Sequence, residues 1–98
     1  MRGEQMDAML TMLKVDLGIS TTTAYDERLR QLLTAARSAI IKEGASTLDA
    51  SNPLDQQLIV MYAAWLWRCR DDMKGMPRML RLALNNRVFG GEAGANDG

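Results

Sequence analysis

The chain has 98 residues, with 12 basic and 12 acidic side chains, no histidine and one cysteine. This length allows a single domain, and a domain of this size is only marginally stable without packing partners. A net charge of zero argues against an arm that binds polyanions. One cysteine excludes an internal disulfide and fits a reducing compartment.

The apolar pattern predicts neither a membrane segment nor an export signal. The longest apolar run, residues 58–67, is shorter than the ~18 residues that cross a bilayer. Residues 1–5 are too short and too polar for a signal peptide. We therefore expect a protein that is cytosolic or assembled from the cytosol, without membrane contact.

The first half of the chain predicts two amphipathic helices. Apolar residues recur every three or four positions over 6–17, and Gly18 suits the C-terminal cap of that helix. After a linker over 19–23, a second helix is expected over 24–43, ended by Gly44. Its predicted buried stripe consists of Tyr25, Leu29, Leu32, Leu33, Ala36 and Ile40.

The polar residues at the start of the second helix predict its local contacts. Thr23 and Asp26 have the spacing of a capping box, with aspartate in place of the usual glutamate. Asp26 and Arg30 have the i,i+4 spacing of an ion pair in its favoured orientation. We therefore expect Asp26 to serve both the cap and this pair.

The second half predicts two further helices. Asn52 is a strong N-cap and Pro53 suits the first helical position, so a third helix is expected to begin here and run to about Lys74. Gly75 would end it, and residues 76–77 would open a fourth helix. The predicted buried stripe of the fourth helix consists of Met76, Leu80, Ala83, Leu84 and Val88.

Together these elements predict an all-α fold, a small single-domain bundle of about four helices with short loops and a flexible C-terminal tail. The helical domain is expected to cover residues 1–89. Residues 90–98 carry no apolar side chain larger than alanine, so we expect them to form a disordered tail.

The apolar run over 58–67 is the most informative feature for function. On a helix it covers every direction, and Trp65 and Trp67 lie about 200° apart. Such a helix must be surrounded, and this chain is short. We expect one indole in the core and the other under a second subunit, unless the other helices cover the third completely. The expected subunit interface comprises Trp65, Trp67, Tyr62 and Arg68.

No motif in the chain predicts catalysis, a cofactor or a metal. Histidine, the usual proton shuttle near neutral pH, is absent. Cys69 lies between two arginines that would lower its pKa, but a free cysteine is more often simply packed. We therefore expect no enzyme.

Eight methionines allow two interpretations, an adaptable binding surface or gap-filling in the core. Met9, Met61, Met76 and Met79 lie on or near the predicted buried stripes. This placement favours gap-filling.

Basic residues concentrate between Arg68 and Arg87, where acids are few. Arg78, Arg81 and Arg87 on the fourth helix are therefore candidate contacts to DNA or to a partner. The alternative is a solvated helix face with salt bridges between subunits. The neutral net charge favours this alternative.

Several short segments, in this order and spacing, resemble the head–tail connector (adaptor) proteins of tailed double-stranded DNA bacteriophages, also called phage DNA-packaging proteins. The resemblance covers about residues 9–89. The segments are 13–16 (LKVD), 24–29 (AYDERL), 32–36 (LLTAA), 61–68 (MYAAWLWR), 75–81 (GMPRMLR) and 84–89 (LNNRVF), with Pro53 leading into the fourth of them.

This resemblance implies a structural subunit of the virion. It implies a ring homo-oligomer, with a dodecamer as one form, that docks under the portal protein and carries a tail-side completion or stopper protein. DNA would pass through the lumen without sequence recognition. Localisation would be the head–tail junction, and the host cytoplasm during assembly. The competing hypothesis is a small helical DNA-binding or packaging factor that uses the basic fourth helix.

Overall fold

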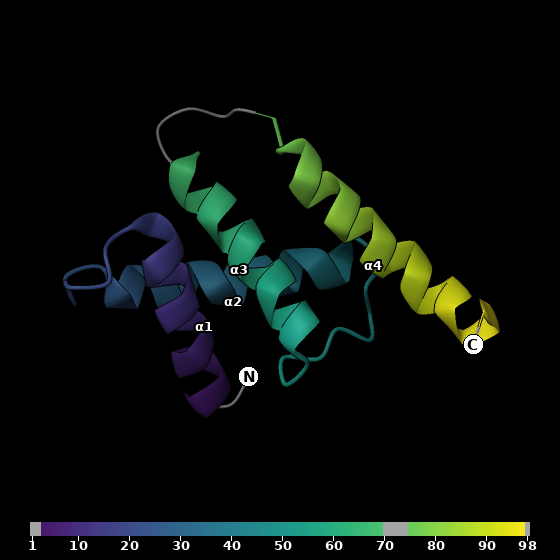
Figure 1. Ribbon diagram of the computed structural model, residues 1–98, viewed down its shortest axis with the longest axis horizontal. Helices are drawn as coiled ribbons and strands as arrows, with labels where there is room; N and C mark the ends of the chain where they lie inside the picture. The colour runs from purple at the N-terminus through teal and green to yellow at the C-terminus, as the bar shows by residue number, and fades with distance from the viewer. Residues whose placement is uncertain (1–2, 70–74, 98) are drawn as a thin grey trace.

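The structure, a computed structural model, describes residues 3–69 and 75–97, the last eight of them as backbone only. It contains α1 (Gly3–Leu17), α2 (Asp26–Lys42), α3 (Pro53–Arg68) and α4 (Arg78–Asp97). α3 is the central helix: it packs against all three others, most extensively against α2 and least against α4 (Figure 1). The predicted all-α fold is confirmed.

α1 begins three residues before the expected start and buries Met9, Leu10 and Leu13. Gly18 ends it in the left-handed region at φ 74°. The amide of Ile19 donates to the carbonyl of Lys14 at 2.9 Å, and that of Gly18 donates to the carbonyl of Val15 at 3.1 Å. These two bonds form a Schellman motif, so the predicted glycine cap is confirmed.

α2 buries the predicted stripe, Leu29, Leu32, Leu33, Ala36 and Ile40, with one exception. Tyr25 was expected in this stripe, but it is the exposed N-cap residue of the helix. The helix begins one turn later than the pattern indicated, so this ring falls outside the helical periodicity.

The predicted polar contacts of α2 are wrong. No side chain caps its start. The carboxylate of Asp26 instead meets the ammonium of Lys14 on α1 at 2.9 Å, and Arg30 lies 3.9 Å from Glu27. The pair with Lys14 is largely shielded from water, which strengthens it over an exposed pair within one helix. Asp26 therefore ties α2 to α1.

α3 begins as predicted and ends earlier. The Asn52 side chain accepts from the amides of Leu54 at 2.8 Å and Asp55 at 3.4 Å, and Pro53 occupies the first turn. The helix ends at Arg68 instead of near Lys74, with Cys69 as its C-cap residue. Residues 70–74, which include part of the predicted basic segment, lie outside the described residues.

α4 begins after Pro77, whose carbonyl accepts from the amide of Arg81 at 2.9 Å. Its inner face confirms the predicted stripe: Leu80 and Leu84 are buried, and Met76, Ala83 and Val88 pack against the core.

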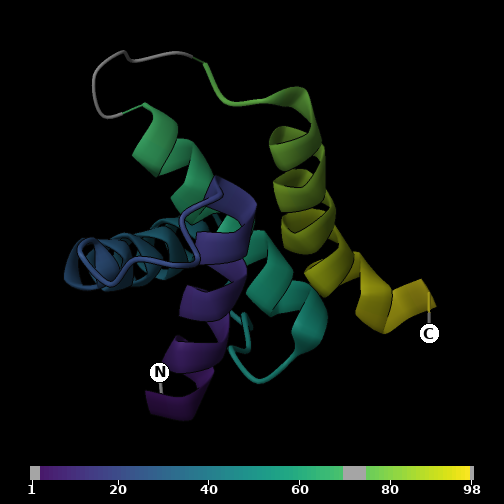
Figure 2. The same cartoon turned by 60° about the vertical axis from the view of Figure 1, so that its left-hand side comes forward.

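The backbone of α4 is helical to Asp97, where the sequence predicted a disordered tail over residues 90–98. Once a helix has formed, each added residue gains one hydrogen bond, so a packed first half can propagate into a weak sequence. This end of α4 projects away from the other helices (Figures 1 and 2). Its departure from the bundle agrees with the predicted domain limit at residue 89.

Candidate interaction surface

The apolar run of α3 is covered by its own chain more fully than the sequence indicated. Six of its ten side chains are buried, because α1, α2 and α4 surround this helix on most sides. They are Leu58, Ile59, Val60, Tyr62, Ala63 and Ala64. The other four, Met61, Trp65, Leu66 and Trp67, are partly buried against the same core. The expectation that this chain is too short to shelter α3 is therefore mostly wrong.

Both indoles are half-buried, in two different environments. Trp67 contacts Tyr25 edge to face, with ring centroids 5.3 Å apart. Trp65 contacts Tyr62 in the same way at 5.4 Å. The expectation of one core indole and one uncovered indole is wrong, because a tyrosine of the same chain partly covers each. An interface centred on both indoles stays a prediction.

The indole N–H of Trp65 is buried and has no acceptor among the described residues. A buried donor without a partner costs about 1–3 kcal/mol. We therefore expect Trp65→Phe to change the free energy of unfolding by less than about 1 kcal/mol, because losing the orphan donor offsets the smaller ring. Urea denaturation of Trp67→Phe, a matched truncation on the same helix, should show the larger loss. A larger loss at Trp65 would contradict this expectation.

Tyr62 and Arg68, the other predicted interface residues, lie in unlike settings. Tyr62 is nearly buried, and this burial raises the pKa of its hydroxyl; Glu43 raises it further, and Arg81 opposes them. Arg68 is exposed and lies 3.8 Å from the Asp16 carboxylate on α1. Tyr62 therefore belongs to the core, and only Arg68 offers a charge at the surface.

An apolar groove runs along α3 between α1 and α4. It consists of three adjoining hollows that all include Met61, two of them about 250 Å³ in volume. Its walls carry large apolar side chains with high exposed fractions, namely Leu54 at 75%, Met79 at 71% and Val15 at 66%. The hollows are smaller than typical small-molecule sites of roughly 300–1,000 Å³. Side chains of another protein would fit them better.

The methionines divide between core and groove. Met9 is fully buried, as gap-filling predicts. Met12, Met61 and Met79 instead line the groove, and the predicted burial of Met79 is wrong. Met79 lies one position from the buried Leu80, and about 100° of rotation is enough to turn it outward. For these three residues the adaptable binding surface is the better interpretation.

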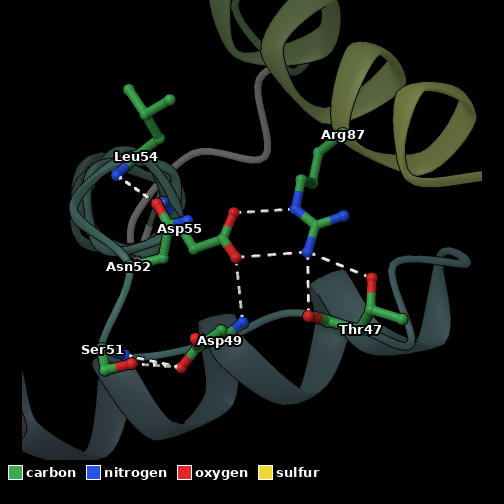
Figure 3. Close-up of polar contacts among 7 residues, drawn as sticks. All are labelled: Thr47, Asp49, Ser51, Asn52, Leu54, Asp55 and Arg87. Carbon is green, nitrogen blue, oxygen red and sulfur yellow. Dashed lines mark hydrogen bonds and ion pairs between the residues drawn. The ribbon is translucent and has the colours of Figure 1, made fainter. Parts of the chain in front are cut away.

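The three candidate arginines of α4 do not form one free basic strip. Arg78 is exposed and forms no ion pair with another described residue. Arg81 lies 3.6 Å from the carboxylate of Glu43. Arg87 points inward to Asp55 on α3 and holds the fold together (Figure 3).

The contacts of Arg87 join three segments. Its Nε donates to Asp55 Oδ1 at 2.7 Å, and its Nη2 donates to Asp55 Oδ2 at 3.2 Å. The same Nη2 donates to the carbonyl and the hydroxyl oxygen of Thr47. The amide of Asp49 donates to Asp55 Oδ2 at 2.9 Å. This network fastens α4 to the α2–α3 loop and to the start of α3 (Figure 3).

The described residues show no other kind of site. They contain no group of three or more acidic, histidine or cysteine side chains placed to hold a metal ion. Cys69 is buried, as the packing interpretation predicts. Within the same residues, no helix has the length and hydropathy to cross a membrane. The apolar groove is thus the principal candidate site.

Comparison with known proteins adds no assignment. No family model, curated protein or solved structure matches the chain. The class that the structure defines is a small all-α domain with an exposed apolar groove.

Proposed function

We propose that this protein is a structural virion assembly protein, a subunit of the ring-shaped head–tail connector of a tailed double-stranded DNA bacteriophage. The ring docks under the portal, continues the DNA channel and carries the tail-side component. The observation that supports this proposal best is the groove of exposed apolar side chains between α1 and α4. Exposed apolar surface of this kind is typical of protein–protein contacts.

Three further features agree with an assembly role. The helical domain is small, so burial against neighbouring copies would add stability that one copy lacks. The resemblance to connector proteins extends over most of the helical domain. The arginines are largely paired within the chain, as suits a subunit that surrounds DNA without reading its sequence.

The experiment is reconstitution with the portal ring encoded by the same genome. The full-length protein and the portal are mixed, separated by sedimentation and imaged by electron microscopy. We expect a ring of this protein below the portal, in a fixed ratio of subunits. Absence of association at concentrations up to about 100 μM would overturn the proposal, since specific interfaces of standard size bind at least at micromolar strength.

The DNA-binding alternative rests on one observation, the exposed Arg78 with Arg81 one turn away. Arg87 does not contribute, because Asp55 and Thr47 occupy its guanidinium. This alternative predicts a gel shift of duplex DNA at low salt that the double substitution of Arg78→Ala and Arg81→Ala abolishes. We expect no such shift. A strong, salt-dependent shift would favour the alternative.

A further inference from the structure

The outer face of α4 carries an apolar ridge. Met79, Leu82 and Phe89 are all exposed, with 71% of the Met79 side chain and 64% of the Phe89 side chain accessible. Their spacing places them within about 80° of one another on the helix. We call these three residues the α4 ridge. Half of the large apolar side chains that are exposed in the described residues belong to it.

A hollow of different shape lies on the other side of α3. Met12, Val15 and Asp16 of α1 form one wall, and Gln57, Val60 and Met61 of α3 form the other. We call this the α1 hollow. α1 and α4 lie on either side of α3 in both views (Figures 1 and 2). One subunit therefore presents an apolar ridge and an apolar hollow at two separate places.

The charges beside these two surfaces are opposite. α1 carries exposed Asp7 and Asp16, and its single base, Lys14, is directed to Asp26. The segment 78–89 of α4 contains arginines and no acid, and Arg78 and Arg81 are exposed near the ridge. Because opposite potentials favour encounter and fix the orientation of two partners, these surfaces are complementary in charge as well as in polarity.

We propose that the occupant of the α1 hollow is the α4 ridge of a second copy of this chain. The ridge places Leu82 and Phe89 against Val15 and Met12, and Arg78 faces the acidic side of α1. This contact joins two different patches, so it is heterologous, and repetition gives a ring when the rotation closes. The inference rests on the proposed ring and assigns its subunit contact.

The test uses two surface variants, each with one patch blocked. Val15→Arg blocks the hollow, and Phe89→Glu blocks the ridge; both positions are exposed, so folding should be retained. Each variant alone should self-associate at least about tenfold more weakly than the natural protein in sedimentation experiments. Mixed together, they should form a one-to-one heterodimer and nothing larger, because one intact hollow and one intact ridge remain. Thr34→Arg, on the exposed face of α2, is the matched control and should change nothing.

The outcomes separate this contact from the ring itself. If the natural protein assembles on portal rings and both variants assemble equally well, the ridge-and-hollow contact is overturned and the proposed function stands. If the variants form the heterodimer but the natural protein ignores the portal, the contact stands and the proposed function fails. A natural protein that is monomeric at about millimolar concentration and on the portal overturns both.

Discussion

Replacing Asp55 by alanine is expected to lower the free energy of unfolding by about 2–4 kcal/mol. Only 4% of this residue is accessible to solvent, and its carboxylate accepts from Arg87 and from the amide of Asp49. The substitution leaves both donors without their acceptor. The Arg87 side chain is partly accessible, so water recovers some of the loss.

Urea denaturation measures this loss, and a double-mutant cycle assigns it. Asp55→Ala, Arg87→Ala and the double variant should show a coupling of about 1–3 kcal/mol, because neither partner is useful without the other. Glu27→Ala is the control: its pair with Arg30 is exposed and 3.9 Å long, so we expect less than about 0.5 kcal/mol. Equal losses for Asp55→Ala and Glu27→Ala would contradict the assignment of this pair to the core.

The pH dependence of the pair follows from the arginine. The hydrogen bond from Arg87 to Asp55 raises the pKa of the guanidinium above its ordinary value of 12.5. A raised pKa means that the stabilisation is complete below the ordinary value and is lost only as the pH rises through the folded one. The arginine side of the pair therefore stays charged throughout the neutral and mildly alkaline range.

The helices could be predicted from the sequence because their signals are local. The stripe of α2, the Asn52 cap and the terminal glycines each depend on residues within one or two turns, and the structure confirms them. The errors at Tyr25 and Asp26 occur where a contact with another element competes with the local pattern.

The candidate surface could not be predicted in the same way. Asp55 and Arg87 are 32 positions apart, and nothing in their local spacing shows that they pair. The groove depends on the placement of α1 and α4 around α3, which periodicity does not specify. One signal was available: Met79, Leu82 and Phe89 fall on one face of α4, away from its leucine stripe. This second apolar face, rather than the tryptophan pair, marks the exposed surface.

The inward contacts of α4 determine how its ridge is presented. Leu80, Leu84 and Arg87 turn toward α3 and the preceding loop, so Met79, Leu82 and Phe89 must turn outward. A change that shifts α4 on α3 would therefore disturb the proposed subunit contact without touching it. The closest approach of α4 to the α2–α3 loop is at Gly44, which makes this glycine the sharpest test of that placement.

Gly44→Ala is expected to lower the free energy of unfolding by about 2–4 kcal/mol, from two causes. The backbone at Gly44 has φ 126°, a conformation that side chains rarely adopt. An added Cβ would also lie 2.9 Å from Cγ1 of Val88 on α4. Valine is stiff at χ1 in a helix, so α4 itself must move to relieve the contact.

Gly18→Ala is the matched control for this loss. Gly18 also caps a helix at positive φ, but a Cβ there meets nothing within 4 Å, so only the backbone cost of about 1–2 kcal/mol remains. Val88→Ala in the Gly44→Ala background should recover the part due to the clash, beyond what Val88→Ala alone predicts. Urea denaturation of these variants separates the two causes. A loss for Gly44→Ala no greater than that for Gly18→Ala would mean that α4 does not approach the loop as closely as the structure shows.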